Sequence, residues 1–522
     1  MYHFKHYLRL LAETIPELNK DLINCSASKN HNNYNCRRME KLKHKILELE
    51  QISAELEPSE KVRNEYLHMI HEYINSFINT IENTRAFYED KADREILSVS
   101  SGKASLSDLI GLYKREVSEK GINAASGAHL GYVPGGGIYT SSLADYIAAV
   151  TNEYAGLYYA SPGAVIIENE ILNWMKSIFG FPMSAAGSLT SGGSIANLIG
   201  LTAARDHHGI KSDSIPKSVV YLSRHTHHCI GKALKIIGLE DIIIRYVEQD
   251  NKWRINAGKL DEQITRDKAD GLNPFLIIAT AGTTDTGAVD PLFEIGMIAA
   301  KNNLWYHIDA AYGGFFILTE EKKGVFRGIE MCDSLVVDPH KGLFIPYGTG
   351  AVLVKNKEAV THSFRYTANY MQDSSNAIAD LYEPADVSPE LTRHFRGLRV
   401  WLPLRLHGLQ PFIACLREKL LLTEYFRKRL AEIGFRTGPE PDLSISYFWY
   451  PSVSVDEDTY NRKLLELIHK DGNVFFSSTI INGKFVIRMA VLSFRTRLRT
   501  IDKAIEIIKT IRLKLEREFD YI

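Results

Sequence analysis

Four short apolar runs, several of them separated by helical patterns, constrain the fold of this 522-residue chain more than any other feature. The runs cover residues 218–222, 275–280, 304–309 and 334–337. They are apolar throughout rather than alternating, which is typical of strands whose two faces are both covered. Helical stretches, such as the one at residues 291–301, lie between several of these runs. The pattern predicts an α/β fold with a mixed, mostly parallel sheet covered by helices.

Polar residues stand where three of these runs end. Thr280 and Asp309 are the last residues of their runs, and Lys341 follows the last run by four residues. In open α/β sheets, ligands bind beyond the carboxyl ends of the strands. We therefore expect these three side chains to lie at one binding site.

Lys341 belongs to the tetrapeptide Asp338-Pro339-His340-Lys341, which is followed by a second apolar run at residues 351–354. A charged lysine close to buried strands is costly unless it is paired. The sequence is compatible with a solvated lysine at a strand end, a salt bridge or a lowered pKa. It is also compatible with a covalent imine to the aldehyde cofactor pyridoxal phosphate (PLP).

Two other segments also allow a structural and a functional interpretation. Asp309 could cap the next helix, or its carboxylate could bond to the protonated nitrogen of a cofactor ring. The segment 190–194, Thr-Ser-Gly-Gly-Ser, could be a serine helix cap or could bind an anion at a helix start. It contains neither GxGxxG nor a GK[ST] ending, so a monophosphate suits it better than a dinucleotide.

The histidine-rich segment His225-Thr226-His227-His228-Cys229 raises the question of a metal site. Its spacing is not that of a zinc site, and no CxxC or HExxH partners it. The alternatives are surface histidines in a loop, or one histidine that stacks on a cofactor ring.

Taken in chain order, these motifs resemble one family. The set consists of Thr-Ser-Gly-Gly-Ser at 190–194, His227, Ala-Gly-Thr-Thr at 281–284, His-Ile-Asp-Ala-Ala-Tyr at 307–312 and Asp-Pro-His-Lys at 338–341. It is similar to that of the group II PLP-dependent amino-acid decarboxylases, the aromatic-L-amino-acid and glutamate decarboxylase family. The resemblance runs from about residue 127 to residue 500. It implies a PLP-dependent transferase-like fold of type I, a large PLP-binding domain with a small C-terminal α+β domain and a helical N-terminal segment.

The resemblance also implies roles for particular residues. Lys341 would form the Schiff base with PLP, Asp309 would pair with the ring nitrogen, and His227 would stack on the ring opposite Ala311. Gly193 and Ser194 would bind the phosphate. Thr280, Asp338 and His340 would line the cofactor, and Tyr132, Pro134 and Gly135 would border the substrate pocket.

The implied reaction is decarboxylation of an L-amino acid to the amine and CO₂, through the Lys341 Schiff base and a quinonoid intermediate. In the family a tyrosine on a mobile loop returns the proton to Cα, and Tyr382 is the candidate among the tyrosines of residues 363–389. Other reactions on the same fold, such as aldehyde synthesis, lysis or transamination, remain alternatives. Ile195, Gly342 and Gly156 depart from the family pattern and argue against assuming an aromatic substrate.

Composition excludes several other functions. The chain has 62 basic and 63 acidic residues, so nothing favours capture of nucleic acid or a membrane surface. No apolar run approaches the roughly 20 residues that span a bilayer, and the N-terminus lacks a signal-peptide core. Five scattered cysteines suit reduced thiols, so we predict a cytoplasmic enzyme.

We predict three parts: a helical segment at 1–125, a PLP-binding domain at 126–400 and a small domain at 401–522. Helices at 41–56 and 62–88 should pack against a partner subunit, because the resemblance implies a homodimer with its active site at the interface. We expect a loop at 24–36 and a strand at 474–478. Arg488 could bind the substrate carboxylate, as an arginine does in transaminases of the same fold, but we favour a structural role for it.

Overall fold

The computed structural model describes residues 31–99, 101–365 and 383–520. The chain divides into two compact units, Met1–Ile78 with Ser101–Gly111, and Asn79–Ser100 with Leu112–Ile522. The described part of the first unit is helical and contains α3 (His31–Ser53), a short 3₁₀ turn (Ala54–Leu56) and most of α4 (Glu60–Thr80). The predicted division at residues 125 and 400 is not tested by this grouping and stays a prediction.

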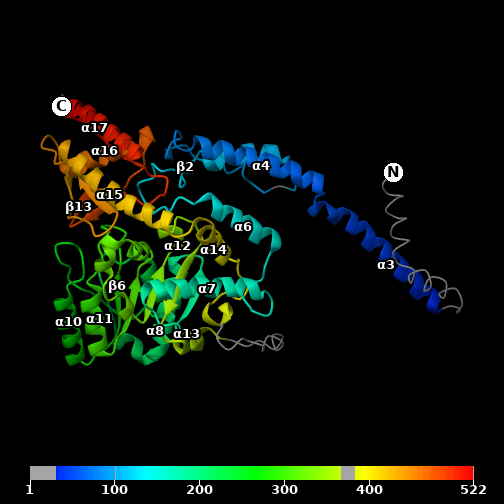
Figure 1. The fold of residues 1–522 in the computed structure, drawn as a ribbon, viewed down its shortest axis with the longest axis horizontal. Coiled ribbons are helices and arrows are strands. Elements are labelled where there is room, and N and C mark those ends of the chain that lie inside the picture. Colours follow the sequence, from blue (N-terminus) through cyan, green and yellow to red (C-terminus); the bar gives the residue numbers. More distant parts are fainter. Residues whose placement is uncertain (1–30, 100, 366–382, 521–522) are drawn as a thin grey trace. The chain divides into compact units, whose positions relative to one another are not determined.

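A seven-stranded sheet forms the centre of the second unit (Figure 1). Its strands lie in the order β3–β9–β8–β7–β6–β4–β5. The four predicted runs are β4 (Ser218–Leu222), β6 (Asn273–Thr280), β7 (Trp305–Asp309) and β8 (Ser334–Val337), and adjacent members of this set pair in parallel. The predicted α/β fold with a mostly parallel sheet is therefore confirmed.

One strand runs against the others and positions the Lys341 turn. The chain leaves β8, forms the short helix α12 (Pro339–Gly342) and returns as β9 (Gly350–Val354). β9 pairs antiparallel with both β8 and β3 (Ala186–Thr190). This hairpin holds Lys341 just beyond the carboxyl end of β8.

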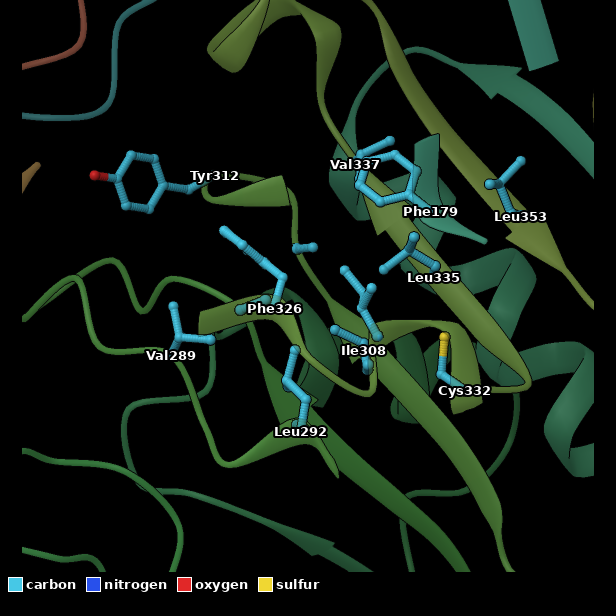
Figure 2. Packing of buried hydrophobic residues seen from close by; sticks show 14 of the residues in the cluster. Phe179, Val289, Leu292, Ile308, Tyr312, Phe326, Cys332, Leu335, Val337 and Leu353 are labelled. Atoms are coloured by element: carbon cyan, nitrogen blue, oxygen red, sulfur yellow. The ribbon is translucent and has the colours of Figure 1, made fainter. Parts of the chain in front are cut away.

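Both faces of the inner strands are buried, which explains why these strands are mostly apolar rather than alternating. One face contributes Ile277, Ile308, Leu335 and Val337 to a core that also contains Phe179. Figure 2 shows part of this core, with Leu335 and Val337 of β8 near Leu353 of β9. The alternate residues of the same strands join the second core, against helices on the opposite face.

Eight helices in the described part of the second unit precede, connect or follow the strands of the large sheet along the chain. They are α6 (Tyr139–Thr151), α7 (Pro162–Phe179), α8 (Gly193–His207), α9 (Cys229–Ile236), α10 (Ala257–Ala269), α11 (Leu292–Asn302), α13 (Lys357–Phe364) and α14 (Gly397–His407). The edge strand β5 (Ile243–Tyr246) completes the sheet.

A four-stranded antiparallel sheet lies in the C-terminal part, in the order β10–β11–β13–β12. Its strands are β10 (Arg436–Thr437), β11 (Ile445–Trp449), β12 (Ser477–Ile481) and β13 (Lys484–Ala490). The helices α15 (Gln410–Glu432), α16 (Glu457–Asp471) and α17 (Leu498–Asp520) share its hydrophobic core.

Three local predictions are wrong. Residues 31–36 belong to helix α3 rather than to a polar loop, since the helix pattern of the following residues extends back through them. The second predicted helix ends at Thr80, because residues 87–88 form β1 and pair with β2 (Gly121–Ile122). Residues 474–476 precede β12, because Phe475 exchanges backbone hydrogen bonds with the segment at 128–130 instead.

No helix in the described ranges is both long enough and apolar enough to cross a bilayer.

Candidate active site

A cavity of about 250 Å³ opens at the carboxyl ends of β6, β7 and β8, beside the start of α8. All nine residues predicted to contact a cofactor line it, although they come from five separate segments of the chain. They are Gly193, Ser194, His227, Thr280, Asp309, Ala311, Asp338, His340 and Lys341. The structure therefore brings together the residues that the sequence motifs single out.

Lys341 reaches the cavity from the α12 turn. Its Nζ lies 2.8 Å from Oδ2 of Asp338, and about a fifth of its side chain remains accessible. Burial by itself lowers the pKa of Lys341, but the carboxylates of Asp338 and Asp309 outweigh it and raise that pKa above its ordinary value. Free Lys341 is therefore an ammonium group held by Asp338, and it must lose a proton before it can attack an aldehyde.

Asp309 ends β7 and is 5% exposed. Its Oδ1 accepts a hydrogen bond from the amide of Ala311 at 3.0 Å, and its Oδ2 accepts one from Nδ2 of Asn197 at 3.2 Å. Burial raises the pKa of the Asp309 carboxyl, while Lys341 and His227 act in the opposite direction. A cationic group in the cavity would stabilise the ionised form further.

His227 lies two residues before α9. The amide of Cys229 donates to its Nδ1 at 3.3 Å, so this nitrogen carries no proton. Burial lowers the pKa of His227, and Asp309 only partly offsets the effect. A neutral imidazole at the cavity wall suits contact with a flat ring.

The start of α8 forms the end of the cavity nearest β3. Gly192, with φ 154°, adopts a backbone conformation that side chains rarely allow. A Cβ on Gly193 would lie 2.9 Å from Oδ2 of Asp338 and 3.2 Å from Cβ of Ala311. The first backbone N–H groups of a helix have no partner within the helix and attract an anion such as phosphate.

Two buried polar atoms at the cavity have no hydrogen-bond partner among the described residues. They are Oγ1 of Thr280 and Oδ1 of Asp338. Buried atoms of this kind are costly unless a ligand satisfies them. Together with the helix start, the Asp309 carboxylate and the Lys341 amine, they fit a small ring that carries a phosphate, a basic nitrogen, a hydroxyl and an aldehyde.

His340 holds the Lys341 turn in place. Its Nδ1 donates to the carbonyl of Thr349 at 2.6 Å, which leaves Nε2 facing Oδ2 of Asp338 at 3.6 Å. Burial lowers the pKa of His340, so the ring is neutral and its proton stays on Nδ1.

The predicted substrate-pocket residues lie beside the cavity and do not line it. Tyr132 is 58% exposed, whereas Pro134 and Gly135 are buried. A Cβ on Gly135 would overlap the carbonyl oxygen of His340, so this segment packs directly on the Lys341 turn. The predicted proton donor, Tyr382, lies outside the described residues.

Sequence reasoning missed several lining residues, of which Asn197 and Cys229 are the most informative. Asn197 follows Gly193 by four residues on α8, so the two share one face of the helix. A polar residue on that face was the available signal. Cys229 is buried, and burial raises the pKa of its thiol to about 12.

In the described ranges, no three or more His, Cys, Asp or Glu side chains are grouped so that they could hold a metal ion. His225 of the histidine-rich segment lies 3.3 Å from the carboxylate of Asp285. Of this segment, His227 and Cys229 line the cavity.

Arg488 has the structural role that the sequence favoured. It donates to the backbone carbonyls of Thr284 and Gly131 and to Oγ of Ser477 at 3.0 Å. Burial lowers the pKa of Arg488 to about 10. The guanidinium therefore ties the Gly131 segment to the edge of the cavity, since Thr284 is a lining residue.

Comparison with known proteins gives a consistent result. The family model described as the pyridoxal-dependent decarboxylase conserved domain matches residues 99–449. An aromatic-L-amino-acid decarboxylase of Bacillus atrophaeus is 36% identical over 392 residues, which cover 74% of this chain and 81% of the relative. A phenylacetaldehyde synthase of Arabidopsis thaliana is 26% identical over 469 residues, covering 86% of this chain and 96% of the relative.

A solved structure agrees with the fold. The crystal structure of Catharanthus roseus tryptophan decarboxylase in complex with L-tryptophan superposes with a TM-score of 0.82 at 22% identity. The match covers 88% of this chain and 99% of that one.

Proposed function

Because this chain belongs to the pyridoxal-dependent decarboxylase family and is a PLP-dependent carboxy-lyase acting on an amino acid, we propose that its substrates are aromatic L-amino acids. We further propose that Lys341 carries the cofactor, with the other eight lining residues named above holding it, and that the active form is a homodimer. The observation that carries the proposal is the cavity that places Lys341, Asp309 and His227 together.

Each part of the cavity has a distinct task in this proposal. Lys341 holds the aldehyde carbon, the start of α8 with Gly193 and Ser194 holds the phosphate, and Asp309 keeps the ring nitrogen protonated. Bound PLP accepts the electron pair that CO₂ leaves on the substrate Cα. Asp338 orients the Lys341 side chain and compensates its positive charge through the 2.8 Å contact between Oδ2 and Nζ.

The preference for aromatic substrates rests on the relatives and on a group of aromatic rings that includes the exposed Tyr132. The Bacillus atrophaeus relative is an aromatic-L-amino-acid decarboxylase. In this chain the rings of His129, Tyr132 and Phe475 lie 5.4 to 6.0 Å apart, next to the Gly131 carbonyl that Arg488 holds. Of these rings, Tyr132 is 58% exposed and is open to contact with an aromatic side chain, whereas His129 and Phe475 are buried.

The glycine at position 156 bears on the same question. A Cβ there would overlap the carbonyl oxygen of Leu391, so any larger residue would displace that segment. The departure from the family pattern at Gly156 is thus explained by packing in this chain and need not reflect a non-aromatic substrate.

The test is to incubate the purified protein and PLP with single L-amino acids and to quantify CO₂ and amine. The panel contains tryptophan, tyrosine, phenylalanine and 3,4-dihydroxyphenylalanine, with glutamate, cysteine sulfinate and 2,4-diaminobutyrate as the alternatives. The proposal predicts turnover that is at least about tenfold faster with an aromatic substrate. Preferential turnover of an acidic or basic substrate would overturn it.

An aldehyde product is the second candidate outcome, because the Arabidopsis thaliana relative is a phenylacetaldehyde synthase. We propose that Tyr382 returns the proton to Cα, so that the amine forms. Tyr382→Phe, compared with Tyr366→Phe and Tyr370→Phe, should then shift the product from amine to aldehyde, with O₂ as the two-electron oxidant and with release of CO₂, ammonia and H₂O₂. An unchanged product in Tyr382→Phe and a shift in one of the other two variants would move the assignment to that tyrosine.

The proposed homodimer is supported by an apolar stripe on α6. Leu143, Tyr146, Ile147 and Val150 follow helical spacing and are 41% to 68% exposed. A second copy of the chain would remove this surface from water. Ile147→Glu should lower the mass measured by light scattering to that of a monomer, whereas Lys235→Glu on the exposed side of α9 should not.

We also propose a cytoplasmic location. Cys229, Cys332 and Cys415 are free thiols in the described part of the chain, as expected for a reducing compartment. Fractionation of cells that express the tagged chain tests this, and recovery outside the cytosolic fraction would contradict it.

A further inference from the structure

A line of buried hydrogen bonds runs from Asp309 into the protein, away from the cavity. It passes through Asn197 of α8, His307 of β7 and Ser334 of β8, and it ends at Trp305 of β7. Trp305 is 2% exposed, and Ser334, His307 and Asn197 have no exposed surface. We call these four residues the Asn197–Trp305 relay.

The strand geometry explains how the relay is assembled. Trp305, His307 and Asp309 alternate along β7, so their side chains share one face of the sheet. Ser334 is the register partner of His307 on β8. α8 packs closely on this face, since a Cβ on Gly200 would lie 2.9 Å from Cε1 of His307.

The distances are those of good hydrogen bonds. Nε1 of Trp305 lies 2.8 Å from Oγ of Ser334, which lies 2.7 Å from Nδ1 of His307. Nε2 of His307 lies 2.7 Å from Oδ1 of Asn197, whose Nδ2 is 3.2 Å from Oδ2 of Asp309.

The chemistry of the groups restricts the direction of the bonds. The indole N–H of Trp305 can only donate, so Oγ of Ser334 accepts from it and can still donate its own proton to Nδ1 of His307. Burial lowers the pKa of His307 to about 3, so the ring is neutral and carries a single proton, which the hydrogen bonds at the Asp309 end favour on Nε2. That proton goes to Oδ1 of Asn197, which leaves the amide N–H of Asn197 to donate to Asp309.

The opposite direction is disfavoured at its last bond. If Nδ1 of His307 carried the proton, the amide of Asn197 would have to turn over to donate to Nε2. Its carbonyl oxygen would then face Oδ2 of Asp309, and two acceptors would meet unless Asp309 were protonated.

We propose that Asn197 and His307 are positioning residues that hold Asp309 as a carboxylate aimed at the cofactor ring nitrogen, with Ser334 and Trp305 completing the relay behind them. This inference rests on the proposed assignment of Asp309 to that nitrogen. With the Ala311 amide on Oδ1 and Asn197 on Oδ2, each oxygen of Asp309 accepts one fixed donor. Each oxygen keeps a further lone pair for the ring N–H.

The relay stabilises the charged form of Asp309 in a place where burial opposes it. A hydrogen bond to a charged group contributes more than a neutral one. Loss of the Asn197 donor should therefore weaken the hold on the protonated ring and raise the dissociation constant for PLP about 10- to 100-fold.

The test uses the full chain loaded with PLP that carries ¹⁵N in the ring. The ¹⁵N chemical shift reports whether the ring nitrogen is protonated, and equilibrium titration of the apo protein gives the dissociation constant. Asn197→Leu should move the shift toward the unprotonated nitrogen and weaken PLP binding. Trp305→Phe and Ser334→Ala should move both in the same direction by less, because they act only through the relay.

A matched control lies on the same helix. Thr202 is buried on α8, and among the described residues its hydroxyl donates to the backbone carbonyl of Leu198. Thr202→Val should leave the ¹⁵N shift of the ring unchanged, which separates the relay from a general disturbance of α8.

Two failures are distinguishable. If the wild-type protein shows no visible band of lysine-bound PLP, or an unprotonated ring nitrogen, the assignments of Lys341 and Asp309 fail. If the wild-type ring is protonated and Asn197→Leu changes neither the ¹⁵N shift nor PLP affinity, the relay alone is overturned.

Discussion

The polar groups at the strand ends of the cavity differ in how completely they are paired. At the end of β7, both oxygens of Asp309 accept hydrogen bonds, from Ala311 and from Asn197 of α8. At the ends of the two neighbouring strands, β6 and β8, Thr280 and Asp338 each keep one buried oxygen atom without a partner in the described chain. Asp309 with its donors is the organised side of this comparison, fixed before a ligand arrives, whereas Thr280 and Asp338 form the side that a ligand completes.

This difference separates two demands on the site. A charge that must stay in one form during the reaction benefits from donors that are fixed in advance. A buried polar atom without a partner is unfavourable in the protein without cofactor. When the cofactor binds and pairs with that atom, the penalty is removed, and this adds to the affinity for the cofactor. The predictions below test each side in turn, beginning with the largest effect.

Asp309→Asn should damage the organised side most. The amide cannot carry the charge that keeps the ring nitrogen protonated, so turnover should fall about 100- to 1,000-fold. Lys341 is unchanged, so the visible band of lysine-bound PLP should remain. Steady-state kinetics and the absorption spectrum check this, and near-normal turnover in Asp309→Asn would show that this carboxylate is not needed.

The organised side should also make the protein sensitive to acid. The pKa of His307 is lowered to about 3 by burial, whereas an unfolded histidine binds its proton near pH 6.5. The unfolded state therefore gains protons between these values, and stability falls as the pH falls. His307→Gln should reduce the loss of unfolding free energy between pH 6.5 and 4 by on the order of 3 kcal/mol.

Urea unfolding at a series of pH values measures this slope. His68→Gln, at an exposed position of α4, is the control and should leave the slope as in the wild type. Equal slopes for His307→Gln and the wild type would mean that His307 is charged in the folded protein.

Gly193→Ala should weaken the end of the cavity where the phosphate is expected. The new Cβ would lie 2.9 Å from Asp338 and 3.2 Å from Ala311, so the helix start must shift. PLP affinity should drop about 10-fold through overpacking. Gly231→Ala is the matched control on α9, because nothing lies within 4 Å of its added Cβ. Titration with PLP measures the affinity of both variants, and an equal loss of affinity in the two would contradict the assignment of the phosphate site.

Thr280→Val should have the smallest effect. It should raise the stability of the protein without cofactor and lower the additional stability that PLP provides. It removes a buried hydroxyl that has no partner, so the apo protein should become about 1 kcal/mol more stable. The gain in melting temperature on adding PLP should shrink, because the ligand no longer satisfies that hydroxyl. A less stable apo variant would show that Oγ1 of Thr280 is already paired in the protein.

Local sequence patterns predicted the sheet and most of the cavity for clear reasons. A strand that is buried on both faces has apolar residues on both, so it does not alternate, and β4, β6, β7 and β8 are mostly of this kind. Residues just past their ends must meet at one edge, which brings Thr280, Asp309 and Lys341 together.

What escaped prediction depends on contacts between distant segments. Asn197 and His307 are 110 residues apart, and neither belongs to a motif that states its partner. The start of β12 was misplaced for the same reason, because Phe475 pairs with the segment around His129. Hydrophobic periodicity reports which side chains are buried, but it does not report what they are buried against.

The most direct test of the account is to find where the cofactor is attached. The protein is incubated with PLP, reduced with borohydride, digested and analysed by mass spectrometry, alongside Lys341→Ala. The account predicts one stoichiometric phosphopyridoxyl group on Lys341, and in Lys341→Ala neither this group nor amine formation from an aromatic L-amino acid. Stoichiometric labelling of another lysine, or CO₂ release by Lys341→Ala at the wild-type rate, would contradict it.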